Sequence, residues 1–199
     1  MRRRNSAKVA TSAGCLPLLR DLLDPDAGTF PRDRAAALLL ALFAQPLTRI
    51  AALTMNDLDI SGEEVRITLG VHGPVPVPEP FGHVLREHAT NRGPRNITAN
   101  QSSPWLFPGS RPGQHVHSTY LMNQLASNGI HLLGTRLAAI RALVQEMPPA
   151  VAAQALGYTS ECTEDHAIQA GATWAAYASH RGRARNAWLR SALNRAHPT

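Results

Sequence analysis

This 199-residue chain is poor in several residue types that carry chemistry in other proteins. Its two cysteines, Cys15 and Cys162, are too few for a disulfide framework and indicate a reducing compartment. Lys8 is the single lysine among 20 basic residues, which excludes any mechanism that needs a lysine in the folded body. The longest apolar run, residues 35–44, has about half the length of a membrane span. We therefore expect no membrane association.

Several functional motifs are also missing from the sequence. It contains no glycine-rich phosphate loop, no Gly-x-Ser-x-Gly turn and no Cys/His dyad. The basic start of the chain lacks the apolar segment that export requires. Two short pairs, His115-x-His117 and Cys162-x-x-x-His166, lie far apart and give no complete set of metal ligands. These absences predict a cytoplasmic protein with no metal, no cofactor and no small-molecule substrate.

The basic residues that are present gather at the two ends of the chain. The net charge is +6, yet residues 21–180 hold ten basic and fourteen acidic residues. Residues 1–20 and 181–199 each hold five basic residues and no acidic ones. A nucleic-acid backbone would therefore be contacted by the ends or by a local patch. The candidates for DNA contact at the carboxyl end are Arg181, Arg183 and Arg185.

The pattern of apolar residues divides the chain into three parts. Residues 1–27 are a basic arm, residues 28–180 a folded domain, and residues 181–199 a basic helix or tail. In the domain, alternating apolar and polar residues predict three short strands at 58–60, 64–69 and 75–77. Helical spacing predicts helices at 31–43, 47–55, 79–90, 120–127, 135–147, 149–156, 160–170 and 173–180. The fold class is mainly α with a small antiparallel three-stranded sheet.

Four short segments in this order give the domain a family resemblance. They are Thr48-Arg-Ile-Ala-Ala-Leu-Thr-Met-Asn-Asp57, Val75-Pro-Val-Pro78, Leu106-Phe-Pro108 and Leu156-Gly-Tyr158. Residues 30–180 resemble the catalytic domain of the tyrosine recombinase (phage integrase) family. The resemblance implies binding of double-stranded DNA and strand transfer through a tyrosine that attacks a phosphodiester. It also implies two arginines that clamp the phosphate and a hairpin lysine that acts as general acid.

The family's reactive residues map incompletely onto this sequence. Arg49 stands near the first arginine position but three residues closer to the strands, and Arg136 stands one residue after the second, which falls on Thr135. Tyr158 takes the place of a later histidine, and Tyr177 is the only tyrosine after it. The hairpin has no lysine: Val71-His72-Gly73 occupies its place. Because partial catalytic sets rarely keep useful rates, we expect strand cleavage to be impaired or lost.

Each of these residues also has a purely structural interpretation. Arg49 and Arg136 are alternatively solvated arginines on helix surfaces. Tyr158 alternatively closes the core beside Gly157, and Tyr177 packs one turn from Trp174. Enzyme activity is thus uncertain from the sequence, while DNA binding in integration or recombination is the leading hypothesis.

An alternative hypothesis is a transcriptional regulator with a helix-turn-helix. Residues 149–157 and 159–171 have the length of such a motif, and Ala153 and Gly157 are small enough for two helices to cross closely. Thr159 and Ser160 would then face the bases. A third hypothesis is a scaffold that binds protein. In the recombinase interpretation, a final helix at 183–196 also offers Trp188, Leu189 and Leu193 for contact with a second copy.

Overall fold

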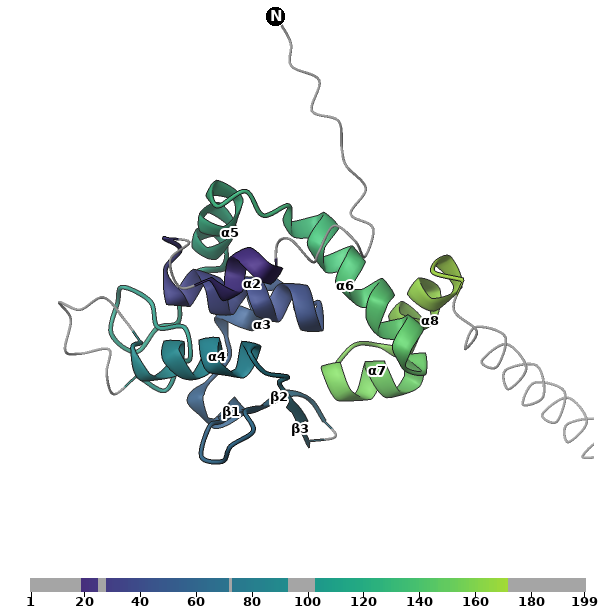
Figure 1. Cartoon of the computed structure of the whole chain (residues 1–199), viewed down its shortest axis with the longest axis horizontal. Helices are drawn as coiled ribbons and strands as arrows, with labels where there is room; N and C mark the ends of the chain where they lie inside the picture. Colours follow the sequence, from purple (N-terminus) through teal and green to yellow (C-terminus); the bar gives the residue numbers. More distant parts are fainter. Residues whose placement is uncertain (1–18, 25–27, 72, 93–102, 172–199) are drawn as a thin grey trace, which may run out of the picture.

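The computed structural model describes residues 19–24, 28–71, 73–92 and 103–171 (Figure 1). Within these residues the fold is mainly helical with one antiparallel three-stranded sheet, as the sequence predicted. In Figure 1, α2 and α3 lie at the centre, α5 and α6 on one side, and α4 with the sheet on the other. Helices α7 and α8 lie at the far end of α6. No helix of the described ranges is long and apolar enough to cross a membrane.

Helix α2, Pro31–Phe43, is the central element of the core. It is apolar nearly all round, and residues 33–41 are buried, because α4 and α6 both pack against it. Pro31 suits the first turn of the helix, where its missing N–H costs no hydrogen bond. The helix ends at Ala44, whose φ of 55° is left-handed, and Pro46 follows. This places the Ala44 carbonyl at a buried corner between elements.

The prediction of a second helix to residue 55 was wrong in its second half. Helix α3, Leu47–Ala51, is only five residues long. The chain then turns extended, and the Leu53 carbonyl accepts a hydrogen bond from Leu106 N at 2.8 Å. Thr54 and Asp57 form a capping box around the short 3₁₀ helix η1, Met55–Asp57. Tertiary pairing with the 104–106 segment thus overrides the local helical pattern.

The sheet consists of β1 (Leu58–Asp59), β2 (Arg66–Gly70) and β3 (Gly73–Pro76) in the order β1-β2-β3. Ile67 lies opposite Leu58 on one side and opposite Val75 on the other. All three predicted strands are therefore present, although β3 begins two residues earlier than expected. Gly70 at the end of β2 meets the backbone of helix α7 so closely that no side chain would fit there. This contact fixes the sheet against the helices that carry the candidate site.

The helices that follow match their predicted positions closely. They are α4 (Phe81–Thr90), α5 (Ser118–Ser127), α6 (Leu132–Glu146), α7 (Pro149–Leu156) and α8 (Ser160–Gln169). Helix α6 begins three residues early because the His131 side chain accepts a hydrogen bond from Gly134 N and caps it. Gly157, with φ of 70°, ends α7. Between α4 and α5, Leu106 and Phe107 are fully buried, as expected for an anchor.

Candidate functional site

The structure brings three of the four predicted catalytic residues to one corner of the domain. Arg49 comes from α3, Arg136 from α6, and Tyr158 from the turn between α7 and α8. They surround the carbonyls that end α2 and α7. Tyr177 lies outside the described residues, as do His72 and the three DNA-contact candidates Arg181, Arg183 and Arg185.

Arg49 holds three segments of the main chain together. Its Nη1 donates hydrogen bonds to the carbonyl oxygens of Leu156 and Gly157, each at 3.1 Å. Its Nη2 donates to the carbonyl oxygen of Leu69 at the end of β2. The guanidinium therefore links α3, the sheet and the end of α7, and a solvated surface position is wrong for this residue. A Cβ atom on Gly157 would overlap it.

Arg136 and Tyr158 share an acceptor. Arg136 Nε donates to the carbonyl oxygen of Ala44 at 2.9 Å, and the Tyr158 hydroxyl donates to the same oxygen. The Arg136 guanidinium also lies 5.8 Å from the centre of the Tyr158 ring. Arg136 is half-buried, so the interpretation as a solvated arginine is wrong here too. Thr135, the position to which the sequence resemblance assigns the second arginine, is buried, and Arg136 next to it lies at this corner.

The electrostatics keep the Tyr158 phenol protonated. Burial raises the pKa of Tyr158 above its usual value of 10, and the hydrogen bond and positive charge of Arg136 oppose this effect. The hydroxyl is a hydrogen-bond donor already bonded to a main-chain carbonyl. A phenol is a poor nucleophile when its pKa is raised and its proton is donated in a hydrogen bond.

Two further residues extend this corner along the seam between α6 and α8. They are Arg141, five residues after Arg136 on the same helix, and His166 on α8. Burial and the charges of Arg141 and Arg136 lower the pKa of His166, while Asp165 opposes them, so all of these groups lie within electrostatic reach. We call Arg136, Arg141 and His166 the basic seam. The sequence analysis noted His166 only in the Cys162-x-x-x-His166 pair and missed Arg141, because a spacing of five residues does not place two side chains on one face of a helix.

The basic seam has buried donors without partners. Arg141 Nε and His166 Nδ1 are inaccessible to solvent and form no hydrogen bond within the described part of the chain. Buried polar groups in proteins are nearly always hydrogen-bonded, which makes these two nitrogens candidates for contact with a bound group. The ion pairs of the described ranges lie elsewhere, at Arg32–Asp33, Arg34–Glu87, Arg66–Glu64 and Arg86–Glu79. The arginines of the seam therefore form no ion pair with a carboxylate among the described residues.

The exposed surface of α8 carries acidic residues, one of which, Asp165, is close enough to His166 to raise its pKa. Glu161, Glu164 and Asp165 are exposed along this helix. Helices α7 and α8 do pack against each other across a short turn, as a helix-turn-helix requires, and Thr163 is fully buried with its hydroxyl bonded to Ser160 O at 2.9 Å. A helix-turn-helix is expected to have an apolar residue six places after Gly157, where this chain has the polar Thr163, and this weakens the helix-turn-helix interpretation. The acidic residues would also repel phosphates on both sides of a DNA groove.

No cluster of three or more metal-ligating side chains occurs in the ranges that the structure describes. The sequence matches no protein-family model and no curated protein. The interpretation of the site therefore depends on its geometry and on the motifs of the sequence.

Proposed function

We propose that this protein binds the phosphate backbone of duplex DNA through the basic seam, on a recombinase-like scaffold that does not cleave the strand. The observation that carries the proposal is the pair of buried, unpartnered nitrogens, Arg141 Nε and His166 Nδ1, beside a second guanidinium at Arg136. A phosphate oxygen placed there would accept hydrogen bonds from both. Charge-assisted bonds of this kind are shorter and stronger than neutral ones.

The same geometry argues against cleavage. Tyrosine-mediated transfer needs a phenol that loses its proton and guanidiniums that are free to follow the charge on the phosphate. The Tyr158 phenol is bonded to the Ala44 carbonyl, and Arg49 is bonded to three main-chain carbonyls. In this proposal, the Arg49 guanidinium and the Tyr158 hydroxyl, which stands at a histidine position of the resembled family, hold main-chain carbonyls instead of a phosphate. A contribution from Tyr177, which lies outside the described residues, is tested directly below.

The second candidate function is the helix-turn-helix regulator, which the packing of α7 on α8 favours. In that interpretation, α8 enters the major groove and Ser160 contacts bases. The exposed Glu161, Glu164 and Asp165 make this arrangement less favourable than a single phosphate contact at the seam.

Fluorescence anisotropy with a labelled 30-base-pair duplex tests the proposal. We expect binding to weaken as the salt concentration rises. Arg141→Gln should reduce the slope of log affinity against log salt concentration by about one, because one fewer counterion is released. Arg66→Gln is the matched control, because Arg66 is a half-exposed arginine on the sheet that pairs with Glu64 at 2.8 Å. Equal affinity and equal salt slope for Arg141→Gln and Arg66→Gln would contradict the role of the seam.

Two further measurements separate the alternatives. A suicide DNA substrate traps any phosphotyrosyl adduct, and we expect none; an adduct that disappears in Tyr177→Phe would restore enzyme status. Ser160→Ala distinguishes the regulator, since it removes a hydroxyl at the exposed start of α8. Loss of sequence preference in Ser160→Ala, with Arg141→Gln unaffected, would favour the helix-turn-helix.

A further inference from the structure

A second site lies on the other side of the core from the basic seam. An open pocket of about 690 Å³ is lined by the start of α2, the end of α4, the segment 108–117 and the start of α5. We propose that this pocket binds a small organic anion, with its acidic group at Arg32 and Arg111 and an apolar body against Phe30 and Tyr120. The volume is in the range of pockets that hold small molecules.

The sign of charge in the pocket favours an anion. Its lining includes two arginines, Arg32 and Arg111, and no aspartate or glutamate. The nearest carboxylate on the same helix, Asp33, is 1% exposed and lies behind the lining, where it accepts a bond from Arg32 Nε at 3.1 Å. Arg111 is exposed and forms no ion pair within the described ranges. An anionic ligand would give this guanidinium a partner of opposite charge.

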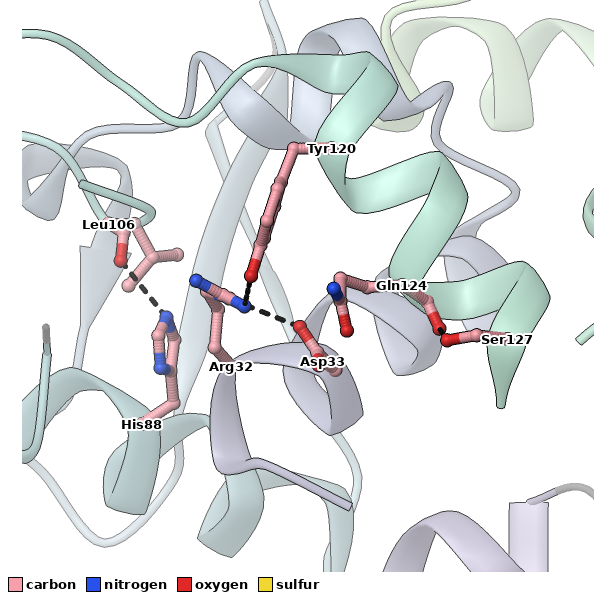
Figure 2. Close-up of polar contacts among 7 residues, drawn as sticks. All are labelled: Arg32, Asp33, His88, Leu106, Tyr120, Gln124 and Ser127. Atoms are coloured by element: carbon pink, nitrogen blue, oxygen red, sulfur yellow. Dashed lines mark hydrogen bonds and ion pairs between the residues drawn. The ribbon is translucent and has the colours of Figure 1, made fainter. Parts of the chain in front are cut away.

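Arg32 is held in place for such a contact (Figure 2). Its Nη2 donates to the Tyr120 hydroxyl at 3.1 Å, and the guanidinium carbon lies 4.8 Å from the centre of the Tyr120 ring. Together with the bond to Asp33, these contacts fix the plane of the guanidinium. Nη1 has no hydrogen bond among the described residues, and the Tyr120 hydroxyl, which accepts from Arg32, keeps its own proton to donate. Two donors thus face the same space from two helices.

The histidines of the lining are set by their hydrogen bonds. His117 Nδ1 accepts from Thr119 N at 3.3 Å, so its Nε2 carries the proton and can donate to a ligand. His88 is buried beside the pocket, and its Nε2 donates to the Leu106 carbonyl at 3.0 Å. Burial lowers the pKa of His88 to about 4, so it adds no charge at neutral pH. His88 is therefore an uncharged wall, and His117 an additional donor.

The pocket also offers apolar surface that other elements leave uncovered. Phe30 is 71% exposed and Tyr120 is 44% exposed, both larger than usual for aromatic side chains in a folded core. Pro31, Pro108 and Val116 complete this apolar part of the lining. A ligand with a flat hydrocarbon body would bury these rings while its acidic group meets the arginines. The proposal departs from the expectation of no small-molecule substrate, which came from the absence of sequence motifs.

Isothermal titration with three naphthalene derivatives tests the proposal, since they share a body and differ in charge. The probes are 2-naphthoate, 2-naphthyl phosphate and the uncharged 2-naphthamide. We expect at least one of the two anions to bind about ten times more tightly than the amide, and the preferred anion identifies a carboxylate or a phosphate ligand. Equal affinity for all three, or binding of none, would overturn the proposal.

Variants locate the site without disturbing the fold. Arg111→Gln removes an exposed charge, and Tyr120→Phe removes one hydroxyl; each should weaken anion binding about threefold to tenfold and leave the amide unchanged. Arg141→Gln is the matched control and should have no effect, which separates this pocket from the basic seam. Anion binding that is lost in Arg141→Gln but kept in Arg111→Gln and Tyr120→Phe would place the ligand at the seam and refute the pocket.

Discussion

Arg136 and Tyr158 donate hydrogen bonds to the same oxygen, the main-chain carbonyl of Ala44. Ala44 ends α2 in a left-handed conformation, where its carbonyl has no partner within the helix. The two side chains therefore cap α2 from a distance. This arrangement explains why residues expected to act on a phosphate are half-buried, and it gives a first prediction.

We expect Tyr158→Phe to lower the free energy of unfolding by about 1 kcal/mol, the usual net value of one hydrogen bond. Arg136 still satisfies the Ala44 carbonyl in this variant, which limits the loss. Urea denaturation followed by circular dichroism measures the change. Tyr120→Phe is the control, since its hydroxyl is exposed and the variant should be nearly as stable as the wild type. A loss above about 3 kcal/mol would contradict this account, because it would be too large for one hydrogen bond and would require a change in the packing of the ring.

The raised pKa of Tyr158 predicts a loss of stability in alkali. Because the folded protein holds the phenol more tightly protonated than the unfolded chain does, the stabilisation is complete below the unfolded pKa of about 10. It is lost as the pH rises toward the higher folded pKa. Unfolding measured from pH 8 to pH 11 should show a steeper decline for the wild type than for Tyr158→Phe. Parallel curves would contradict the burial of this hydroxyl.

Gly157 tests the position of Arg49. Gly157→Ala should lower the free energy of unfolding by about 3 kcal/mol, from the left-handed backbone and from displacement of the Arg49 guanidinium. Gly129→Ala is the matched control, because Gly129 has φ of 79° with nothing near its missing Cβ. It should cost only about 1 kcal/mol. Equal losses in the two variants would show that Arg49 does not occupy this place.

His88 predicts instability in acid. Burial lowers its pKa from 6.5 to about 4, and the charges of Arg32 and Arg92 lower it further, while the hydrogen bond that His88 donates to the Leu106 carbonyl opposes them. The stabilisation is present above the unfolded pKa and is lost as the pH falls toward 4. We expect the wild type to lose about 3 kcal/mol more than His88→Gln between pH 7 and pH 4. The same acid dependence in both proteins would remove His88 as its source.

Arg34 joins residues 19–23 to the core. It is 3% exposed, and it donates to Leu22 O at 2.8 Å and to Leu23 O at 3.1 Å. Arg34→Met should lower the free energy of unfolding by about 3 kcal/mol. The two carbonyls lose their hydrogen-bond donor, and the Glu87 carboxylate loses its ion pair with Arg34. The surface pair of Arg66 with Glu64 gives the comparison, and Arg66→Gln should cost less than about 1 kcal/mol. Thermal unfolding of both variants distinguishes these values.

The positions of helices and strands were predictable from the sequence because their causes are local. Apolar spacing, Pro31 at a helix start and Gly157 at a helix end act within a few residues. The exception is the segment after Ala51, where pairing of Leu53 with Leu106 replaced the expected helix. The local pattern of residues around Leu53 does not predict pairing with Leu106, which lies far away in the sequence.

The roles of the side chains at the candidate site were decided by the tertiary structure. The sequence showed that Arg49, Arg136 and Tyr158 exist and that a lysine is missing from the hairpin. It did not show their acceptors, which lie 107 residues away for Arg49 and Leu156, and 114 for Tyr158 and Ala44. A guanidinium or a phenol bonds to whichever oxygen the fold brings within about 3 Å. Composition and spacing therefore determined which groups are available, and packing determined that these three hold the chain's own backbone.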